Sequence, residues 1–398
     1  MEIAVQDWAS MLVRWIHIIT GIAWIGSSFY FIWLDLSLRQ RDDLPEGAYG
    51  EVWSVHGGGF YHVQKYLVAP NQMPDELHWF KYESYFTWLS GFCLLAIMYY
   101  WGAESFLVDT DKLAIEPWQA IVGSITFLAG GWVAYDAICK SPLGRNTAVL
   151  AMLVFILVVV SSYGLSQVFS DRAAMLHVGA MIGTIMTGNV FFIIIPNQKI
   201  VVDDLKNGRS PDPSLGIQAK QRSTHNNYLT LPVLLMMISN HYPMLSGAEK
   251  GWMIVALILL IGGIVRHYFN TAHTGAKGKA LMWQWPVATA LVVGLILLVS
   301  ARSGEEIAVE DVISAPQALA IIQTRCIACH AAKPIDPDFE KAPGDLKFED
   351  VESVRKNATR ILAQSVLSKA MPLANKTGMT AEERKQLGGW IRAGMPVE

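Results

Sequence analysis

Long apolar runs constrain this chain more than any other feature of its sequence. They occupy residues 11–34, 84–102, 118–138, 147–169, 173–196, 228–242, 251–268 and 281–301. Most have about 18 to 24 residues, the length at which a helix crosses the roughly 30 Å hydrocarbon core of a bilayer. Because a bilayer offers no water to backbone polar groups, such runs must be helical. The sequence therefore predicts an all-α, polytopic membrane helix bundle of about eight spans over residues 1–302.

The sixth run is the least regular of the eight, because it is short and contains Pro232. A proline removes one backbone donor and leaves a carbonyl group free inside a helix. Such an interruption is tolerated in a membrane only where protein or a cavity satisfies the freed groups. We therefore expect this span to be broken or partly re-entrant.

The composition turns polar after residue 302. Residues 303–316, SGEEIAVEDVISAP, are acidic and predict a linker, and residues 317–398 predict a small soluble domain. The formal charge of the whole chain is only −3. A charge so close to zero argues against nucleic acid as a partner, whereas membrane lipid must surround the predicted spans.

Lysine and arginine are distributed unevenly between the loops that join the predicted spans. One set of loops carries thirteen of these residues and the alternate set carries three. Positively charged loops stay in the cytoplasm, so the asymmetry predicts an orientation in the bacterial inner membrane. With an even number of spans, both the N-terminus and the C-terminal domain lie in the periplasm; an odd number would reverse the second placement.

The C-terminal domain contains the sequence CIACH, formed by Cys326, Cys329 and His330. This spacing is the attachment motif of c-type haem, in which two thiols bind the vinyl groups and the histidine ligates iron. The alternatives are a redox dithiol, which usually accompanies a βαβ pattern, and a zinc site, which needs further Cys or His ligands. The domain shows neither feature. We therefore predict one covalent haem c in a small class I cytochrome c domain, and covalent haem attachment outside the cytoplasm agrees with the charge asymmetry.

The sixth iron ligand is expected to be a methionine later in the domain. The segment SKAMPLANKTGMT contains Met371 and Met379, and Met371 precedes a proline in an extended stretch. A thioether ligand raises the reduction potential of a haem, which suits an electron acceptor. We favour Met371. We also expect Trp390, on the last helix, to pack against the helix that leads into the cysteine motif.

Two histidines lie inside predicted spans at similar depth, His17 in the first and His177 in the fifth. Ionisable groups inside a membrane are costly and usually mark a function. A haem b held between His17 and His177 is one interpretation. The alternative is that each histidine only hydrogen bonds to neighbouring groups.

A denser polar set lies at the ends of the spans that are expected on the cytoplasmic side. It could hold a small planar anion, because amides offer donors and acceptors, cations offset charge and aromatic faces stack on rings. The alternative is interfacial snorkelling, aromatic belts and helix caps. The members on which we base the anion site are His62, Asn197, Gln198, His225, Asn226, Arg266 and His267.

Several long motifs resemble one family. They are HIITGIAWIGSSFYF, HGGGFY, NVFFIIIPNQ, HNNYLTLPVLLMMISNHYP and MPLANKTGMTAEERKQLGGWIRAG. In these motifs the chain resembles the bacterial membrane-bound, cytochrome c-linked urate oxidases, which are also called urate hydroxylases. The resemblance implies that urate and water give 5-hydroxyisourate without hydrogen peroxide. It also implies that two electrons leave through cytochrome c to a cytochrome c oxidase or a soluble cytochrome.

The resemblance and the polar set together give a hypothesis for the mechanism. Urate, an anion at neutral pH, would bind among Asn197, Gln198, Asn226 and Arg266, stacked on an aromatic ring. His62 or His267 would act as general base, since the pKa of histidine lies near the working pH, with His225 as a further catalytic candidate. If this site is cytoplasmic, an intermediate carrier is needed to cross the membrane, which is the physical motive for haem b.

Four other functions compete with urate oxidation. The chain could be a quinol:cytochrome c reductase or a non-enzymatic electron-transfer subunit, and haem c would then be reduced by a quinol. A haem–copper oxidase component is disfavoured, because no adjacent histidine pair occurs. A transporter with a fused cytochrome would fit a broken sixth span. The sequence leaves the number of haems, the side of urate entry and a homo-oligomeric state open.

Overall fold

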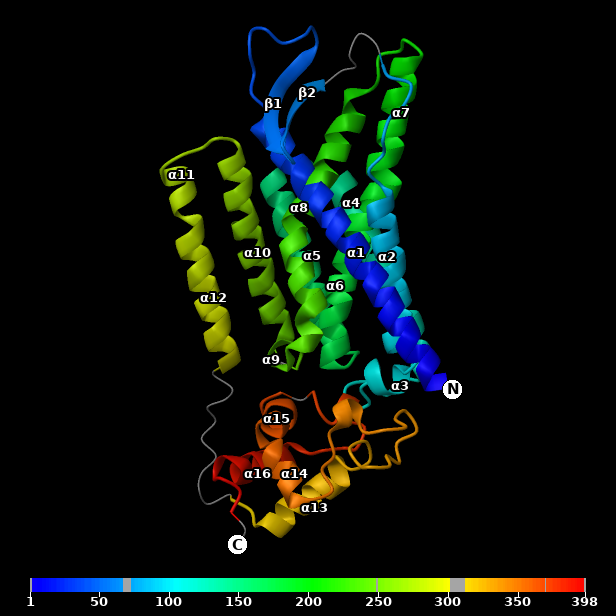
Figure 1. Cartoon of the computed structure of the whole chain (residues 1–398), viewed down its shortest axis with the longest axis vertical. Coiled ribbons are helices and arrows are strands. Elements are labelled where there is room, and N and C mark those ends of the chain that lie inside the picture. The colour runs from blue at the N-terminus through cyan, green and yellow to red at the C-terminus, as the bar shows by residue number, and fades with distance from the viewer. Residues whose placement is uncertain (1, 67–72, 248–249, 301–311, 369, 397–398) are drawn as a thin grey trace.

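The computed structural model describes residues 2–66, 73–247, 250–300, 312–368 and 370–396. A smaller helical domain lies at one end of a long helical bundle (Figure 1). Within the described residues, six helical segments are long and apolar enough to span a membrane: Val5–Ser37, Pro117–Lys140, Thr147–Ser166, Asp171–Lys206, Gly251–His273 and Lys279–Ser300. These segments correspond to α1, α4, α5, the continuous stretch from α6 to α7, α10, and α11 with α12.

The two other predicted spans are also helical. α2 (Tyr82–Leu95) continues into the π-helix η1 (Ala96–Tyr100) and packs along α1. α8 (Pro213–Ile238) packs against α6 (Asp171–Gly188) and α10 (Gly251–His273). The expectation of a broken sixth span is wrong, because α8 continues through Pro232. Its proline ring packs against Gly262 of α10, where an added Cβ would lie 2.6 Å from Pro232 Cδ.

A β-hairpin corrects the expectation of an all-α chain. β1 (Ala48–His56) and β2 (Gly59–Tyr66) pair in antiparallel fashion at the end of the bundle that carries α7 (Figure 1). The two-residue turn between them has Gly57 at φ +59° and Gly58 at φ +80°. Such turns favour glycine, because both central residues need positive φ. The sequence HGGG, part of the motif HGGGFY quoted above for the family resemblance, therefore serves the turn.

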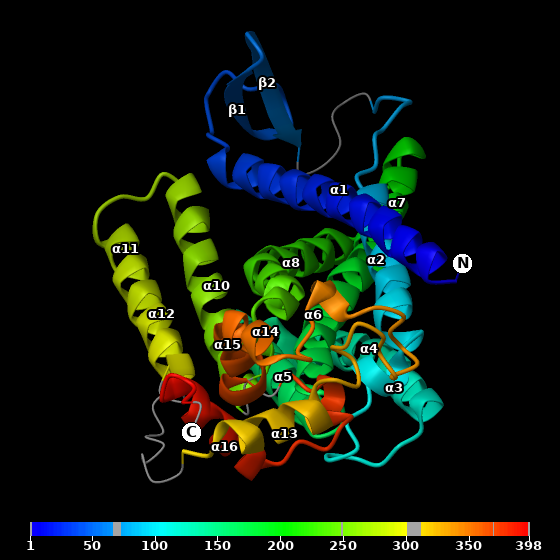
Figure 2. The same cartoon turned by 60° about the horizontal axis from the view of Figure 1, so that its bottom comes forward.

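The core of the bundle gathers around α6 and α8. Both pack on several neighbours, and α6 is the most buried of the apolar helices. α6 continues through the π-helix η3 (Asn189–Ile194) into α7 (Ile195–Lys206). α12 (Gln284–Ser300) packs mainly on α10 and lies at the outside of the bundle (Figure 2).

The C-terminal domain, residues 312–396, has its own core, and we call it the tail domain. It contains α13 (Ala315–Arg325), α14 (Val351–Lys356), α15 (Ala358–Ile361) and α16 (Ala381–Arg392). The predicted packing of Trp390 is confirmed: its side chain is fully buried in the core where α13 and α16 meet, which also contains Ile322 of α13. Most of the predicted linker, residues 303–316, falls outside the described residues.

The tail domain lies at the same end of the bundle as the N-terminus, opposite the hairpin (Figure 1). Figure 2 brings this end forward. The contacts involve α3 (Ala103–Phe106) and α9 (Pro243–Ser246) on the bundle. The N-terminus and the tail domain thus share one end of the bundle, as they would with an even number of crossings.

Candidate functional site

The CIACH motif forms a tight turn at the end of α13. The amide groups of Cys329 and His330 both donate to the carbonyl oxygen of Cys326, at 3.3 and 2.9 Å. Both thiols are free. The Nδ1 atom of His330 lies 2.8 Å from the carbonyl oxygen of Leu346, so Nδ1 carries the proton that this acceptor requires. Nε2 is then the nitrogen with a lone pair to offer a metal, and the backbone contact fixes the direction of the ring.

Burial sets the protonation of these three groups. It raises the pKa of the Cys326 thiol to about 12, with a further contribution from Cys329. Burial and the nearby Asp336 raise the pKa of Cys329 to about 11. Burial also lowers the pKa of His330, against the effect of its bond to Leu346. At neutral pH the structure therefore holds two protonated thiols and a neutral imidazole.

Both candidate methionines lie in the segment that precedes α16. The backbone of Met371 is held at each end: its amide donates to Gln364 O at 2.9 Å, and its carbonyl accepts from Arg384 at 2.6 Å. Met379 is only 2 % exposed and belongs to the tail core, against which Cys326 also packs. Met379 therefore shares the tail core with the CIACH turn, and Met371 stays the predicted ligand.

His17 and His177 have different neighbours in the bundle. Nδ1 of His17 lies 3.0 Å from Thr87 O and 3.1 Å from Ser90 Oγ, and its ring lies against Gly91 of α2. His177 is fully buried, with Nε2 2.7 Å from Ser124 Oγ and Nδ1 2.7 Å from Ala173 O. These contacts are the hydrogen bonds that the alternative interpretation expects. Ligation of iron by His177 would require the bond to Ser124 to break.

The polar segment of α8 from Arg222 to Tyr228 connects α8 to three neighbouring elements. Successive residues of a helix point about 100° apart, so adjacent members of the segment face different neighbours. Two separate clusters result, and the predicted site residues divide between them.

The first cluster lies between α4 (Pro117–Lys140), η3 and α8. Nδ1 of His225 lies 2.7 Å from the hydroxyl of Tyr135, which also accepts a bond from Asn189 at 3.0 Å. Asn189 further donates to Asn226 Oδ1 at 2.9 Å. Arg222, 3 % exposed, pairs with Asp136 of α4 at 2.7 Å, and Lys140 pairs with the same carboxylate. The buried charge of Arg222 is therefore compensated.

The second cluster lies between α1 (Glu2–Ser37), α8 and α10, and we call it the Arg266 site: Phe29, Asn227, Arg266 and Asn270. Arg266 is 4 % exposed. Its Nε donates to Asn227 Oδ1, and its guanidinium carbon lies 3.9 Å from the centre of the Phe29 ring. Asn270 follows Arg266 by four positions on α10 and so shares its face.

Arg266 differs from Arg222 in having no counter-charge within the described part of the chain. None of the ion pairs found in the described residues involves Arg266, and its Nη2 has no hydrogen-bond partner among them. The Oδ1 atom of Asn270 is likewise buried without a partner there. An unpaired charge is expensive inside a protein, and more so inside a membrane. The Arg266 site therefore offers a cation, a free acceptor and an aromatic face to a planar anion.

His267 is the predicted catalytic residue next to this site in sequence. Its Nδ1 lies 2.9 Å from the hydroxyl of Tyr228, and Trp283 lies beside its ring, with centroids 5.9 Å apart. α10 begins near the tail domain and ends near the hairpin (Figure 1). Arg266 and His267 lie within the last two turns of α10, in the half of the bundle away from the tail.

The remaining predicted residues lie elsewhere. Asn197 donates to Leu215 O at 3.2 Å, at the start of α8, and Gln198 is exposed on α7. His62 lies on the hairpin, 2.6 Å from Glu51 and stacked on Trp53 at 4.2 Å. Neither of these two contacts of His62 involves a residue of the Arg266 site. The sequence reasoning missed Tyr135, Asp136 and Asn189, although a tyrosine and an aspartate inside an apolar run are the polar signal that marks such groups.

The fold and these sites define a helical protein with several apolar helices of membrane length, buried polar clusters and an appended domain that carries a C-x-x-C-H turn. The model of the family described as Urate oxidase N-terminal matches residues 3–301. The chain therefore belongs to this family, which suggests an oxidoreductase with a urate-related function. No curated protein and no solved structure matches the chain. The family match covers the bundle and ends before the tail domain.

Proposed function

We propose that the protein oxidises urate with water to 5-hydroxyisourate in the membrane of a bacterium, with the tail domain in the periplasm. The half-reaction releases two protons and two electrons and forms no hydrogen peroxide. The observation that carries the proposal is the buried guanidinium of Arg266, which lies within the family-matched residues and has no counter-charge among the residues that the structure describes. Urate, planar and anionic, supplies the missing charge.

The Arg266 site would bind urate by three contacts of different kinds. The guanidinium group donates to a urate oxygen through its free Nη2, Asn270 Oδ1 accepts from a ring N–H, and Phe29 covers one face. Asn227 holds the guanidinium in place. Asn226 faces the neighbouring cluster, and Asn197 and Gln198 lie on α7. Urate held at the Arg266 site would therefore need a second point of contact to meet these three residues.

We assign the general base to His267. In the tautomer that this role requires, Nδ1–H donates to the Tyr228 hydroxyl and fixes the ring, so the unprotonated Nε2 can take the proton of urate or of the attacking water. His267→Gln is expected to lower kcat by about 10²-fold or more, the usual contribution of a general base, with little change in urate affinity. His225→Gln and His62→Gln serve as comparison variants, because their partners are Tyr135 and Glu51. A larger kcat loss in His62→Gln than in His267→Gln would move the base to the hairpin.

The residues of the tail domain fit a covalent haem c. Two free thiols, a neutral imidazole with an available Nε2 and a nearby thioether are the donor set that this group requires. When bound, haem c would accept the electrons one at a time and deliver them to a cytochrome c oxidase or a soluble cytochrome. The chain's own contribution is to orient His330 through Leu346 and to bury Cys326 against the tail core.

A haem b between His17 and His177 remains part of the proposal. The Arg266 site and the tail domain lie toward opposite ends of the bundle, and His177 lies within two turns of the start of α6, toward the tail. A carrier at this depth would shorten the electron path. His177→Ala and His17→Ala should each remove a b-type band from a pyridine haemochrome spectrum. An unaltered b-type band in both variants, or none in the wild type, rules out this pair as ligands.

The proposed function is tested by stoichiometry with the purified, haem-loaded protein. We expect two molecules of added ferric cytochrome c to be reduced for each urate consumed, with no hydrogen peroxide formed. Peroxide in amounts equal to urate would contradict the proposal. Reduction by a quinol and not by urate would establish the quinol:cytochrome c reductase instead.

A further inference from the structure

One polar contact joins the tail domain to the bundle through a serine of α3. Ser105, 1 % exposed, donates to Asp338 of the tail. Lys376 of the tail donates to Ser105 Oγ at 3.1 Å, to Asp336 at 3.0 Å and to Asp338 at 3.1 Å. We call these four residues the latch. Ser105, Asp338 and Lys376 bond to one another in a closed ring, and Asp336 bonds to Lys376.

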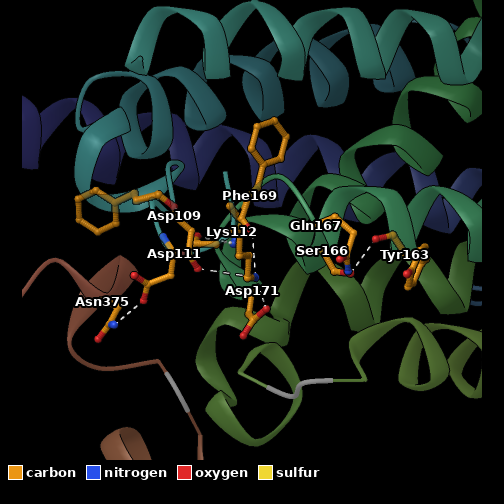
Figure 3. A network of polar contacts seen from close by, with 12 residues as sticks. Asp109, Asp111, Lys112, Tyr163, Ser166, Gln167, Phe169, Asp171 and Asn375 are labelled. Atoms are coloured by element: carbon orange, nitrogen blue, oxygen red, sulfur yellow. Dashed lines mark hydrogen bonds and ion pairs between the residues drawn. The ribbon is translucent and has the colours of Figure 1, made fainter. Parts of the chain in front are cut away.

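A second contact lies beside the latch. Asn375 of the tail donates to Asp111 of the bundle at 2.6 Å, and the two side chains face each other in Figure 3. The loop that carries Asp111 is itself held, because Lys112 pairs with Asp171 at 2.5 Å and donates to Phe169 O at 3.0 Å. The bundle therefore presents to the tail a polar surface whose loop is held in place by these bonds.

The latch lies on the face of the tail that carries the predicted haem attachment. The thiol of Cys329 lies 3.6 Å from Asp336, a latch residue. Lys376 and Asn375 lie in the short segment between Met371 and Met379, the two candidate iron ligands. Docking through these residues directs one attachment cysteine and the methionine segment toward the bundle.

The contact between the two domains is polar and incompletely filled. A cavity of about 540 Å³ lies next to it, lined from both sides by charged groups that include Asp109, Arg172 and Arg384. Lys376 and Asp338 stay ionised near neutral pH. Burial opposes the charge of both Lys376 and Asp338, but their mutual bonds prevail, raising the pKa of the lysine and lowering that of the aspartate. Polar interfaces of this kind between domains can separate again.

We propose that Ser105 and Lys376 are positioning residues that dock the tail domain with its Cys329 side against the bundle, so that electrons from urate enter through this face. The inference rests on the proposed function. Its physical reason is that electron transfer slows steeply with distance, so a tail held at a fixed, short separation receives electrons faster than one that is free. Each electron reduces one ferric haem c to the ferrous state, and urate is the reductant.

Docking is tested without any turnover. In the haem-loaded protein, Ser105→Cys and Asp338→Cys are combined, and a protease site is inserted into residues 303–316. After mild oxidation and cleavage, the tail should stay attached to the bundle on a non-reducing gel and separate on a reducing gel. Each single cysteine variant should lose the tail under both conditions. Loss of the tail from the double variant under non-reducing conditions overturns the proposal.

The role in electron entry is tested by charge reversal. Lys376→Glu should slow the anaerobic reduction of haem c by urate about ten-fold or more, since several charge-assisted bonds are lost. The control is Lys347→Glu, which makes the same charge change at a lysine that pairs with Asp345 within the tail. This variant should not slow the reduction of haem c by urate. Reduction by dithionite, the midpoint potential and the haem content should be equal in both variants. An equal urate rate in both overturns the inference, whereas a wild-type haem that urate does not reduce refutes the proposed function first.

Discussion

Replacing Arg266 by methionine should weaken urate binding about 10²-fold while leaving the protein as stable as before, or more stable. The loss of affinity follows from removing a charge-assisted bond of about 3 kcal/mol. The gain or constancy in stability follows from removing a buried charge that has no ion-pair partner among the described residues. Equilibrium dialysis with labelled urate measures the first effect, and thermal unfolding in detergent measures the second.

Arg222→Met is the matched control, because Arg222 is equally buried but pairs with Asp136. Removing one partner of a buried ion pair strands the other, at a cost of up to about 3 to 5 kcal/mol. Lys140, which also pairs with Asp136, reduces that cost. We expect Arg222→Met to lower the midpoint of thermal unfolding. The assignment of the anion site fails if Arg266→Met is destabilised as much as Arg222→Met and retains its affinity for urate.

Changing Cys326 and Cys329 together to serine should abolish c-type haem and, with it, all urate-driven electron flow. The serine hydroxyl cannot form the thioether bonds that hold the group. His330→Ala should also remove the native c-type spectrum, because the imidazole is the predicted proximal ligand. A pyridine haemochrome spectrum and haem staining of a denaturing gel measure the loss.

Cys93→Ser and Cys139→Ser are the controls for this result. Both cysteines lie on bundle helices and are free thiols, as Cys326 and Cys329 are. Their replacement should leave haem staining unchanged. Haem that stays covalently bound to the tail in the Cys326/Cys329 double variant would contradict the attachment site.

Much of the helical architecture could be predicted from the sequence, because an apolar run of membrane length allows few alternatives to a helix. Every predicted span is helical in the structure. The hairpin was missed although its signals are local: alternating polar and apolar residues flank Gly57 and Gly58. Pro232 was over-interpreted, since its effect on α8 depends on the space that Gly262 leaves on another helix.

The geometry of the candidate sites likewise depends partly on residues that are adjacent in sequence and partly on residues that are far apart in sequence. The CIACH turn is set by five consecutive residues, so its geometry follows from the motif, whereas the carbonyl oxygen that orients His330 comes from Leu346, sixteen positions away. His225 and Asn227 are close in sequence but bond to different helices. Which of them meets Arg266 depends on how α1, α8 and α10 pack, and apolar patterning does not specify that packing.

The central claim is that electrons from a substrate bound in the bundle reach an iron centre in the tail. An anaerobic visible spectrum of the purified, haem-loaded protein tests it most directly. On addition of urate, we predict the appearance of the sharp ferrous c-type bands, with half an equivalent of urate consumed for each haem that is reduced. A spectrum that stays ferric with excess urate, while dithionite reduces the same sample, would contradict the account.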